Sequence, residues 1–190
     1  MSDLMLDVGQ ANELKLAFRR ANFSNDDIKR LCEGNVLAEV RSVLRGHASI
    51  TVIEHVIDCD ANPFVPDDWS VEEHRKGDQF KWNKEAQRDA LYLSKGQQGG
   101  KYIEGNKLCK ELEGKPVLNA NVLDYLLANP HLIPEEWKGK AIFFWGTIYR
   151  DRDGDLCVRC LLWSGDRWDW GFDWLGYDWD DNDPAAVPAS

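Results

Sequence analysis

The sequence predicts an α+β protein in which an N-terminal bundle of short helices is packed with a C-terminal antiparallel β domain. Two patterns indicate this class. In the first region apolar residues recur at three- and four-residue spacing, which is typical of amphipathic helices. Between residues 141 and 180, aromatic and β-branched runs are separated by turn signals, which is typical of an antiparallel meander. We therefore expect a helical region at 1–48 and a mixed α+β domain at 49–190.

Three short helices are expected in the first region. Ser24 is expected to begin the second helix, with Asp27 as the returning carboxylate of a capping box, and Asn35 to begin the third. Gly34 and Gly46 are expected to end these two helices. The apolar faces that would form the bundle are Leu14, Ala17, Phe18 and Ala21, then Ile28, Leu31 and Cys32, then Val36, Leu37, Val40, Val43 and Leu44.

The middle region is expected to mix strands, loops and helices. Asn119 is expected to begin a helix, and Pro134 to open a single turn that ends near Trp137. In chain order we expect a strand at 50–57 that is covered on both faces, a loop at 58–68, a hairpin at 69–82 that turns at 76–78, and helices at about 84–94 and 106–112.

The last region is expected to form consecutive antiparallel strands. Asp153-Gly154 is a strong signal for a tight hairpin turn, and Ser164-Gly165 predicts a second turn. Three strands that share an apolar face can be stable where one hairpin is not. The expected strands cover 142–149, 156–163 and 167–175.

Residues 167–174 read RWDWGFDW, with a ring at every second position. Side chains alternate between the faces of a strand, so four rings are expected on one face and polar or small groups on the other. Each ring can bury roughly 150–250 Å², which is too much to leave in water on a soluble monomer. We therefore expect these rings to be core rather than an exposed platform for sugars or bases. They are Trp168, Trp170, Phe172 and Trp174.

If the rings are a scaffold, the residues between them and in the following turns face the solvent. A polar surface rich in Asp, Asn, Gly and Tyr on a stiff aromatic support resembles a paratope in composition. We expect a non-catalytic protein that binds a protein or small ligand there, without a cofactor or metal, and an acidic surface favours a basic partner. The expected ligand-binding residues are Asp166, Arg167, Asp169, Gly171, Asp173, Gly176, Tyr177, Asp180, Asp181, Asn182 and Asp183.

Several sequence segments also resemble those of a known group of proteins. FVPDDWSVEEH, LIPEEWKGK, FFWGTIYRD, DLCVRCLLW and DWDDNDPAAV resemble a group of uncharacterised proteins from candidate-phylum, ultra-small bacteria, over most of residues 50–187. That group, which keeps a Trp framework while differing at the small and polar positions between, is similar to the target proteins of diversity-generating retroelements. The resemblance implies a diversified C-terminal ligand-binding surface, often on a C-type-lectin-like scaffold, and carries no established activity.

A nucleic-acid-associated regulator is a second hypothesis. Residues 13–45 carry seven basic side chains against five acidic ones, and a recognition helix could present Arg41 and Arg45 to a DNA groove. This excess of positive charge is small. Residues 141–190 have a net charge of -6, which repels phosphates, so nucleic acid is disfavoured as a partner of the Trp-rich segment.

An enzyme is a third hypothesis. Cys59 could act as a nucleophile, with His55 or His74 as its base. Asp58 and Asp60 would raise the thiol pKa, which opposes an active thiolate. The sequence has no phosphate-binding glycine motif and no nucleophile elbow, so catalysis has little support.

Two patterns resemble metal sites. Asp151, Asp153 and Asp155 are spaced like part of a calcium loop, but no bidentate Glu follows and the hairpin turn accounts for the same residues. Cys157 and Cys160 form a C-x-x-C within a predicted strand, where alternation points the two sulfurs to opposite faces. Neither pattern is expected to hold a metal.

Composition excludes further classes. The net charge of -10 disfavours attraction to nucleic acid or anionic lipid, and the sequence has no run of 18 apolar residues that could span a membrane. The first residues lack the features of a secretory signal, so a cytoplasmic location is expected. The five cysteines are scattered and odd in number, so we expect reduced thiols.

Overall fold

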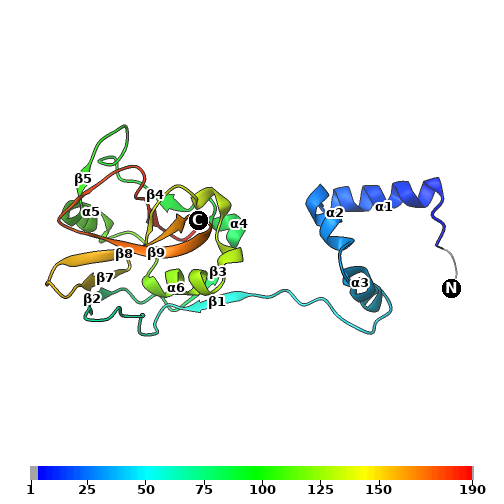
Figure 1. Ribbon diagram of the computed structural model, residues 1–190, viewed down its shortest axis with the longest axis horizontal. Helices are drawn as coiled ribbons and strands as arrows, with labels where there is room; N and C mark the ends of the chain where they lie inside the picture. Colours follow the sequence, from blue (N-terminus) through cyan, green and yellow to red (C-terminus); the bar gives the residue numbers. More distant parts are fainter. Residues whose placement is uncertain (1–3, 190) are drawn as a thin grey trace. The chain divides into compact units, whose positions relative to one another are not determined.

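The computed structural model describes residues 4–189, and its contacts divide the chain into two compact units between Ile53 and Glu54. Figure 1 shows helices α1 to α3 in the first unit, and a curled sheet with further helices and loops in the second. The α+β class is therefore confirmed. The C-type-lectin-like scaffold stays a prediction.

The helices of the first unit begin and end largely where the sequence predicts. The capping box of α2 is confirmed, because the Ser24 hydroxyl accepts from the Asp27 amide while the Asp27 carboxylate accepts from the Ser24 amide. Asn35 precedes α3 without a capping hydrogen bond from its side chain. Gly34 and Gly46 follow α2 and α3 in the left-handed conformation. The helices are α1 (Val8–Arg20), α2 (Asn25–Leu31) and α3 (Val36–Leu44).

The predicted apolar core of this unit is wrong. Within the described residues 4–53 no side chain is buried, and Phe18, Ile28 and Val43 are only half-buried. Helices of 7 to 13 residues on tight turns share too little surface to enclose one another's apolar faces. Local caps therefore define these helices more than tertiary packing does.

The second unit is built around a seven-stranded sheet in which β8 makes the most pairings. One edge of β8 pairs with β7 and then β6, while the other edge pairs with β9 along its length. The antiparallel meander predicted for β7, β8 and β9 is confirmed, with Gly154 and Gly165 in the left-handed conformation at its turns. The strands are β2 (Ser70–His74), β4 (Leu91–Tyr92), β6 (Ile142–Phe143), β7 (Thr147–Arg150), β8 (Leu156–Ser164), β9 (Arg167–Trp174) and β11 (Ala185–Ala186).

Small two-stranded sheets and short helices complete the described part of this unit. β1 (His55–Asp58) pairs with β3 (Gln79–Trp82), and β5 (Ile103–Glu104) pairs with β10 (Asp178–Trp179). The predicted cap at Asn119 is confirmed. No helix among the described residues has the length and apolar character to cross a membrane. The helices are α4 (Lys84–Gln87), α5 (Gly105–Leu112) and α6 (Ala120–Ala128), with single 3-10 turns at Pro130–Leu132 and Glu135–Trp137.

The hairpin predicted at residues 69–82 is wrong, although both of its strands exist. β2 pairs with β7, and β3 pairs with β1. The turn between them lies against the segment after β1, where the Asp60 carboxylate accepts from the Gly77 and Asp78 amides. The Cys59 amide donates to the Asp78 carbonyl as well. These long-range bonds outweigh the local turn signal.

Two other elements are shorter than the sequence predicts. The strand expected at 50–57 contains only β1, and residues 50–54 are exposed coil. The helix expected at 84–94 contains only α4, because Leu91 and Tyr92 join the sheet as β4 opposite β11. The β1–β3 pairing ends at His55 opposite Trp82, so residues 50–54 lie beyond it, whereas Leu91 and Tyr92 take their conformation from pairing with β11.

The strand predicted at 142–149 is divided into β6 and β7 at Gly146. A Cβ at Gly146 would lie 2.8 Å from the Asn119 Cβ, so the close approach of the α6 N-terminus requires glycine. β6 also pairs in parallel with β11, which makes the sheet mixed rather than wholly antiparallel.

Both faces of the sheet are covered. Leu161 and Trp168 belong to a core that includes the apolar side chains of α6. Val158 and Cys160 belong to a second core that includes Leu108 and those of α5. Because β8 alternates between two cores, its buried residues form a nearly continuous apolar run.

Candidate ligand-binding groove

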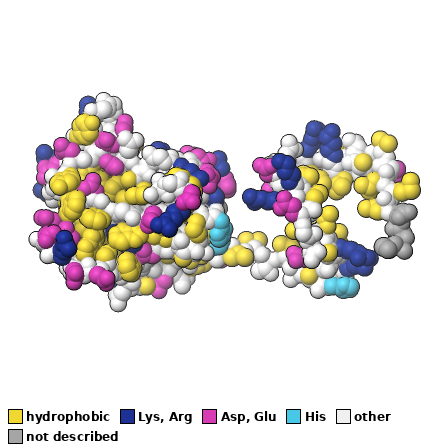
Figure 2. Space-filling view, in the orientation of Figure 1, with side chains coloured by type: hydrophobic (Ala, Val, Ile, Leu, Met, Phe, Trp, Pro, Cys, Tyr) yellow, Lys and Arg dark blue, Asp and Glu magenta, His cyan; other side chains and the backbone are white. Residues whose placement is uncertain are grey.

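An aromatic row lies on the surface of the second unit. Phe172 and Tyr177 are 38% and 57% exposed, and the other two members are half-buried. Figure 2 shows hydrophobic side chains gathered on the face where β8 and β9 lie, with acidic side chains at the border. Consecutive ring centroids along the row are 5.2, 5.0 and 4.8 Å apart, in tilted or edge-to-face contacts that aromatic pairs favour. The aromatic row consists of Tyr177, Trp174, Phe172 and Trp69.

Asp151 fixes the centre of this row. Its carboxylate accepts a hydrogen bond of 2.8 Å from the Trp174 indole N–H. The other carboxylate oxygen accepts from the backbone amides of Asp153 and Asp155, at 3.0 and 2.9 Å. The Trp174 bond, followed by these amides, lowers the pKa of Asp151 below its usual range. The β7–β8 turn and the Trp174 ring are therefore held together by one ionised carboxylate.

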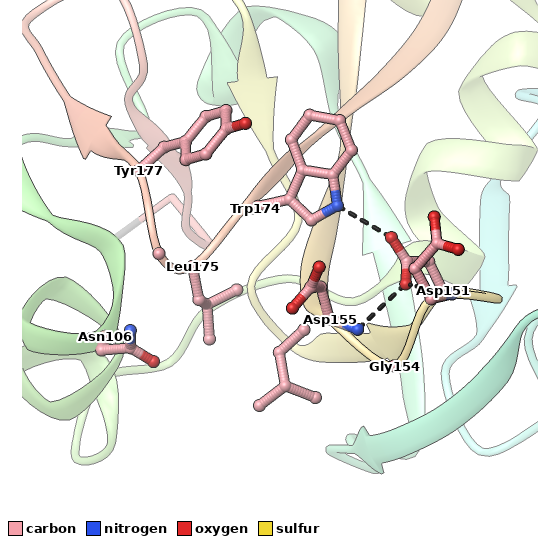
Figure 3. Close-up of a pocket in the computed structure, with 10 residues that line it drawn as sticks. Asn106, Asp151, Gly154, Asp155, Trp174, Leu175 and Tyr177 are labelled. Atoms are coloured by element: carbon pink, nitrogen blue, oxygen red, sulfur yellow. Dashed lines mark hydrogen bonds between the residues drawn. The ribbon is translucent and has the colours of Figure 1, made fainter.

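Two hollows flank Trp174, and together they form what we call the groove. Their volumes are about 420 and 330 Å³, and both are bounded by Asp151, Asp153 and Trp174. Figure 3 shows the larger hollow, with the Trp174 indole between Tyr177 and Asp151. Asn106, Gly154, Asp155, Leu156, Leu175, Gly176 and Tyr177 complete the larger hollow, and Pro66, Asp67, Asp68, Trp69, Arg152, Trp170 and Phe172 complete the smaller one.

The groove is strongly acidic. The cations and carboxylates that line it are Arg152 and five aspartates. Four of these carboxylates are exposed to solvent, and that of Asp151 is half-buried. We call these five residues the acidic rim: Asp67, Asp68, Asp151, Asp153 and Asp155.

The loop between β9 and β10, which carries Tyr177, is anchored by α5. The first amide of α5, from Gly105, donates to the Tyr177 carbonyl at 2.9 Å, and the Asn106 amide donates to the Leu175 carbonyl at 2.8 Å. Helix N-terminal amides have no partner within the helix, so these bonds satisfy them and hold the loop. A Cβ at Gly105 would lie 2.5 Å from the Trp179 Nε1, so the contact also requires glycine.

A buried arginine underlies the smaller hollow. Arg159 is 1% exposed, and its Nη1 and Nη2 donate to the Asp124 carboxylate at 3.2 and 2.8 Å. Its guanidinium lies 4.6 Å from the Trp170 ring centroid and 5.1 Å from that of Phe64. The Tyr149 hydroxyl donates to the Phe64 carbonyl at 2.9 Å. The guanidinium and carboxylate charges compensate each other, so we assign this ion pair a role in stability rather than in ligand binding.

The predicted ligand-binding residues are only partly brought together. Gly176 and Tyr177 line the groove, but the other nine do not. Gly171 packs on the sheet, where a Cβ would lie 2.8 Å from Leu162, and burial raises the pKa of Asp183. Exposed outside the groove are Asp166, Arg167, Asp181 and Asn182, and half-buried outside it are Asp169, Asp173, Asp180 and Asp183.

The rings of β9 divide between core and surface. Trp168 is 8% exposed and belongs to the core beside α6, as predicted. The prediction is wrong for Phe172, which is 38% exposed, and holds in part for Trp170 and Trp174, which are half-buried. Trp170 packs against the α6 core and Trp174 against the cluster that contains Ala120 at the start of α6, so one side of each ring meets the core and the other side lines the groove.

The structure opposes the Cys59 nucleophile. The ring nitrogens of His74 bond to the Thr147 hydroxyl and to the Cys59 carbonyl, rather than to the thiol. The Nδ1 of His55 lies 3.0 Å from the hydroxyl of Tyr125. Burial, aided by the neighbouring carboxylates, raises the pKa of the Cys59 thiol to about 11. The raised pKa favours the protonated thiol at neutral pH, and the hydrogen bonds of the two histidines go to other groups.

The two patterns that resemble metal sites have other surroundings in the structure. Cys157 and Cys160 point to opposite faces of β8, as the alternation predicts, and burial raises the pKa of each thiol to about 12. The carboxylate oxygens of Asp151 accept from two backbone amides and Trp174. Among the described residues, no group of three or more His, Cys, Asp or Glu side chains is arranged to hold a metal ion.

Part of the groove could have been found from the sequence. The predicted turns at Asp153-Gly154 and Ser164-Gly165 set an antiparallel register in which Trp174 lies opposite Cys157, close to the first turn. Nothing local indicates that the Asp67–Trp69 segment joins the groove. Its position depends on the pairing of β2 with β7.

Comparison with known proteins gives no relative: no family model matches the chain, and neither a curated protein nor a solved structure matches it significantly. The resemblance to the bacterial group and to retroelement targets stays a prediction. So does nucleic-acid binding through α1 to α3. Function has to be inferred from the residues of the groove.

Proposed function

We propose that the protein is a non-catalytic binding protein whose groove takes positively charged side chains of a partner protein. One observation carries this proposal: five carboxylates line the same two hollows as a row of four aromatic rings, with Arg152 as the cation in the lining. An ammonium or guanidinium group can contact a ring face and a carboxylate at the same time. Cation–π contacts contribute about 0.5–2 kcal/mol each.

The net charge of the lining favours a cation over a sugar. Five carboxylates and one cation, Arg152, line the groove, whereas its other side-chain donors, such as the Asn106 amide and the Tyr177 hydroxyl, are neutral. A neutral sugar would leave this excess of negative charge uncompensated. A Lys or Arg side chain supplies donors and charge together, which is what the acidic rim lacks.

Most of the acidic rim is exposed, which sets the expected kinetics. Exposed charges steer a partner of opposite charge and raise its association rate, and salt screens this effect over roughly 10 Å. Association with a basic partner should therefore slow as salt is added. Dissociation should depend more on the aromatic row.

The proposal can be tested by titrating the full chain with tetralysine while following Trp fluorescence, with calorimetry as a second readout. The double variant Asp153→Asn, Asp155→Asn should weaken binding about three- to tenfold, because it removes two rim charges. The double variant Asp166→Asn, Asp181→Asn removes the same net charge from exposed positions outside the groove. It should change affinity by less than about twofold.

Tetraglutamate and cellotetraose complete the experiment. Neither should bind measurably, because one is repelled by the rim and the other lacks charge. Equal losses in both double variants would mean that net charge alone attracts tetralysine, and the groove would then have no specific role. If cellotetraose binds more tightly than tetralysine, the ligand of the groove is a saccharide and the proposal of a cationic ligand is wrong.

A diversified surface, as in retroelement targets, extends this proposal to the exposed residues of the C-terminal region. Its test is the neighbouring DNA. A reverse transcriptase gene together with an imperfect copy of the codons for about residues 160–187 is the expected finding. If the neighbouring DNA contains no such copy, the surface is not diversified in this way, and the groove proposal is unaffected.

A further inference from the structure

A third hollow, which we call the cationic hollow, shares no lining residue with the groove. Its volume is about 330 Å³, at the lower end of the range of small-molecule sites. The turn between β2 and β3, strand β3 and the loop before α6 line it, together with Cys59 and Pro188. The residues that matter most here are Arg75, Lys76, Phe80, Lys115, Val117 and Leu118.

The charged side chains that line this hollow are all cations, in a chain of net charge -10. Within the described residues, Lys76 and Lys115 have no carboxylate within ion-pair distance, while Arg75 pairs with Glu73 at 2.8 Å. The Lys115 ammonium lies 4.4 Å from the centroid of the Tyr92 ring, which is not part of the lining. In the described part of the chain, Lys76 and Lys115 therefore both lack an anionic partner, although the Lys115 ammonium also contacts the Tyr92 ring.

The walls of the hollow are mostly hydrocarbon. Phe80 and Val117 are half-buried, and Leu118 is buried. The Asn119 side chain donates to the carbonyls of Cys59 and Arg75, at 2.9 and 3.0 Å, and so joins the two loops that form the walls. The shape is therefore fixed without a ligand, which reduces the entropy lost on binding.

Apolar walls under a cationic edge complement a molecule with an apolar body and a single anionic end. We propose that the cationic hollow binds a small amphipathic carboxylate, with its carboxylate between Lys76 and Lys115 and its apolar body against Phe80 and Val117. A polyanion such as nucleic acid lacks the apolar body, and an aliphatic alcohol lacks the charge. Both features are required, so the class of ligand is narrow.

Calorimetric titration of the full chain with phenylbutyrate at neutral pH and low salt tests this site. Phenylbutyrate should bind at least tenfold more tightly than phenylbutanol, which has the same ring and no charge. The double variant Lys76→Met, Lys115→Met should lose at least tenfold in affinity. The matched variant Lys101→Met, Lys107→Met removes equal charge from exposed positions outside the hollow and should bind as the parent does.

Amide chemical shifts locate the ligand independently of any variant. Addition of phenylbutyrate should move the backbone signal of Gly77 and the side-chain signal of Asn119, but not those of the groove. Equal affinity for phenylbutanol, unchanged affinity in the Lys76, Lys115 variant, or shifts confined to other residues would each overturn the proposal. The Asp153, Asp155 variant should bind phenylbutyrate normally, so this result is separate from the test of the groove.

Discussion

Arg159 illustrates how a single buried residue supports the groove, because it packs behind the Trp170 ring. Its guanidinium is buried between two aromatic rings and pairs with Asp124, whose side chain is 29% exposed. Within the described residues its Nε has no hydrogen-bond partner. A buried charge that is only partly satisfied depends on its partner, because an unpaired ion in the interior is costly.

Replacement of Asp124 by Leu should therefore lower the free energy of unfolding by about 3 kcal/mol, as expected when one partner of a buried pair is lost. The double variant Asp124→Leu, Arg159→Met should recover part of this loss, because it removes the uncompensated charge. Urea denaturation at neutral pH measures both. A double variant less stable than Asp124→Leu alone would show that Arg159 stabilises the fold through ring contacts rather than through its ion pair.

The lowered pKa of Asp151 predicts how the stability of the protein depends on pH. Its pKa is lowered in the folded protein, so the ionised carboxylate stabilises the fold at neutral pH. This contribution declines as the pH falls from the usual carboxyl range of about 4 through the lowered pKa. The thermal midpoint of Asp151→Asn should lie below that of the parent at neutral pH, and the difference should shrink in acid.

Asp153→Asn is the matched control, because it changes the same turn without touching Trp174. Its thermal midpoint at neutral pH should lie closer to that of the parent than the midpoint of Asp151→Asn does. If the difference between Asp151→Asn and the parent is independent of pH, the Trp174 bond does not require the charged carboxylate.

At the scale of elements, the boundary between α5 and the loop after β9 decides the shape of the larger hollow. Gly105→Ala would place a Cβ 2.5 Å from the Trp179 Nε1 and 2.8 Å from the Leu175 backbone. We expect a loss of about 2 kcal/mol in unfolding free energy, as for overpacked cores. Tetralysine binding should weaken as well, because Tyr177 moves with the loop. Urea denaturation and the fluorescence titration measure the two effects.

Gly114→Ala is the control for this substitution, because a Cβ at Gly114 meets no atom within 4 Å and φ there is not positive. It should leave binding unchanged and should be neutral or stabilising by about 0.5 kcal/mol. Normal binding and stability in Gly105→Ala would mean that the loop adapts freely to α5.

Elements encoded by neighbouring residues are the ones that sequence reasoning finds. The capping box at Ser24 and Asp27, the cap at Asn119 and the turn at Asp153-Gly154 all depend on contacts within a few residues. β2, β3 and β4 are different, because each pairs with a strand far along the chain. Local patterns give the conformation of such strands but not their partners.

At the scale of the whole molecule, the groove combines segments that are distant in sequence. The Asp67–Trp69 loop, the β7–β8 turn and the end of β9 each contribute rings or carboxylates. Sequence reasoning found the acidic, aromatic composition of the C-terminal region. It placed the binding surface on the polar side of β9, since it treated all four rings of that strand as core.

The two units also differ in what stabilises them. Residues 54–189 contain apolar cores on both faces of a sheet, whereas residues 4–53 bury no side chain. Burial of apolar surface supplies most of the free energy that makes unfolding cooperative, at about 25 cal/mol per Å². When the two units are separated, we therefore expect cooperative unfolding only for residues 54–189.

A fragment that begins at Glu54 should unfold cooperatively, with a thermal midpoint within about 3 °C of the full chain, which corresponds to less than about 1 kcal/mol. A fragment of residues 4–53 should show partial helicity that declines gradually on heating, because short helices without burial lack a cooperative transition. Circular dichroism of both fragments and the full chain measures this. A steep transition in the helical fragment would reveal burial that one copy alone does not provide. A large drop in the midpoint of the Glu54 fragment would show that the helices stabilise the sheet.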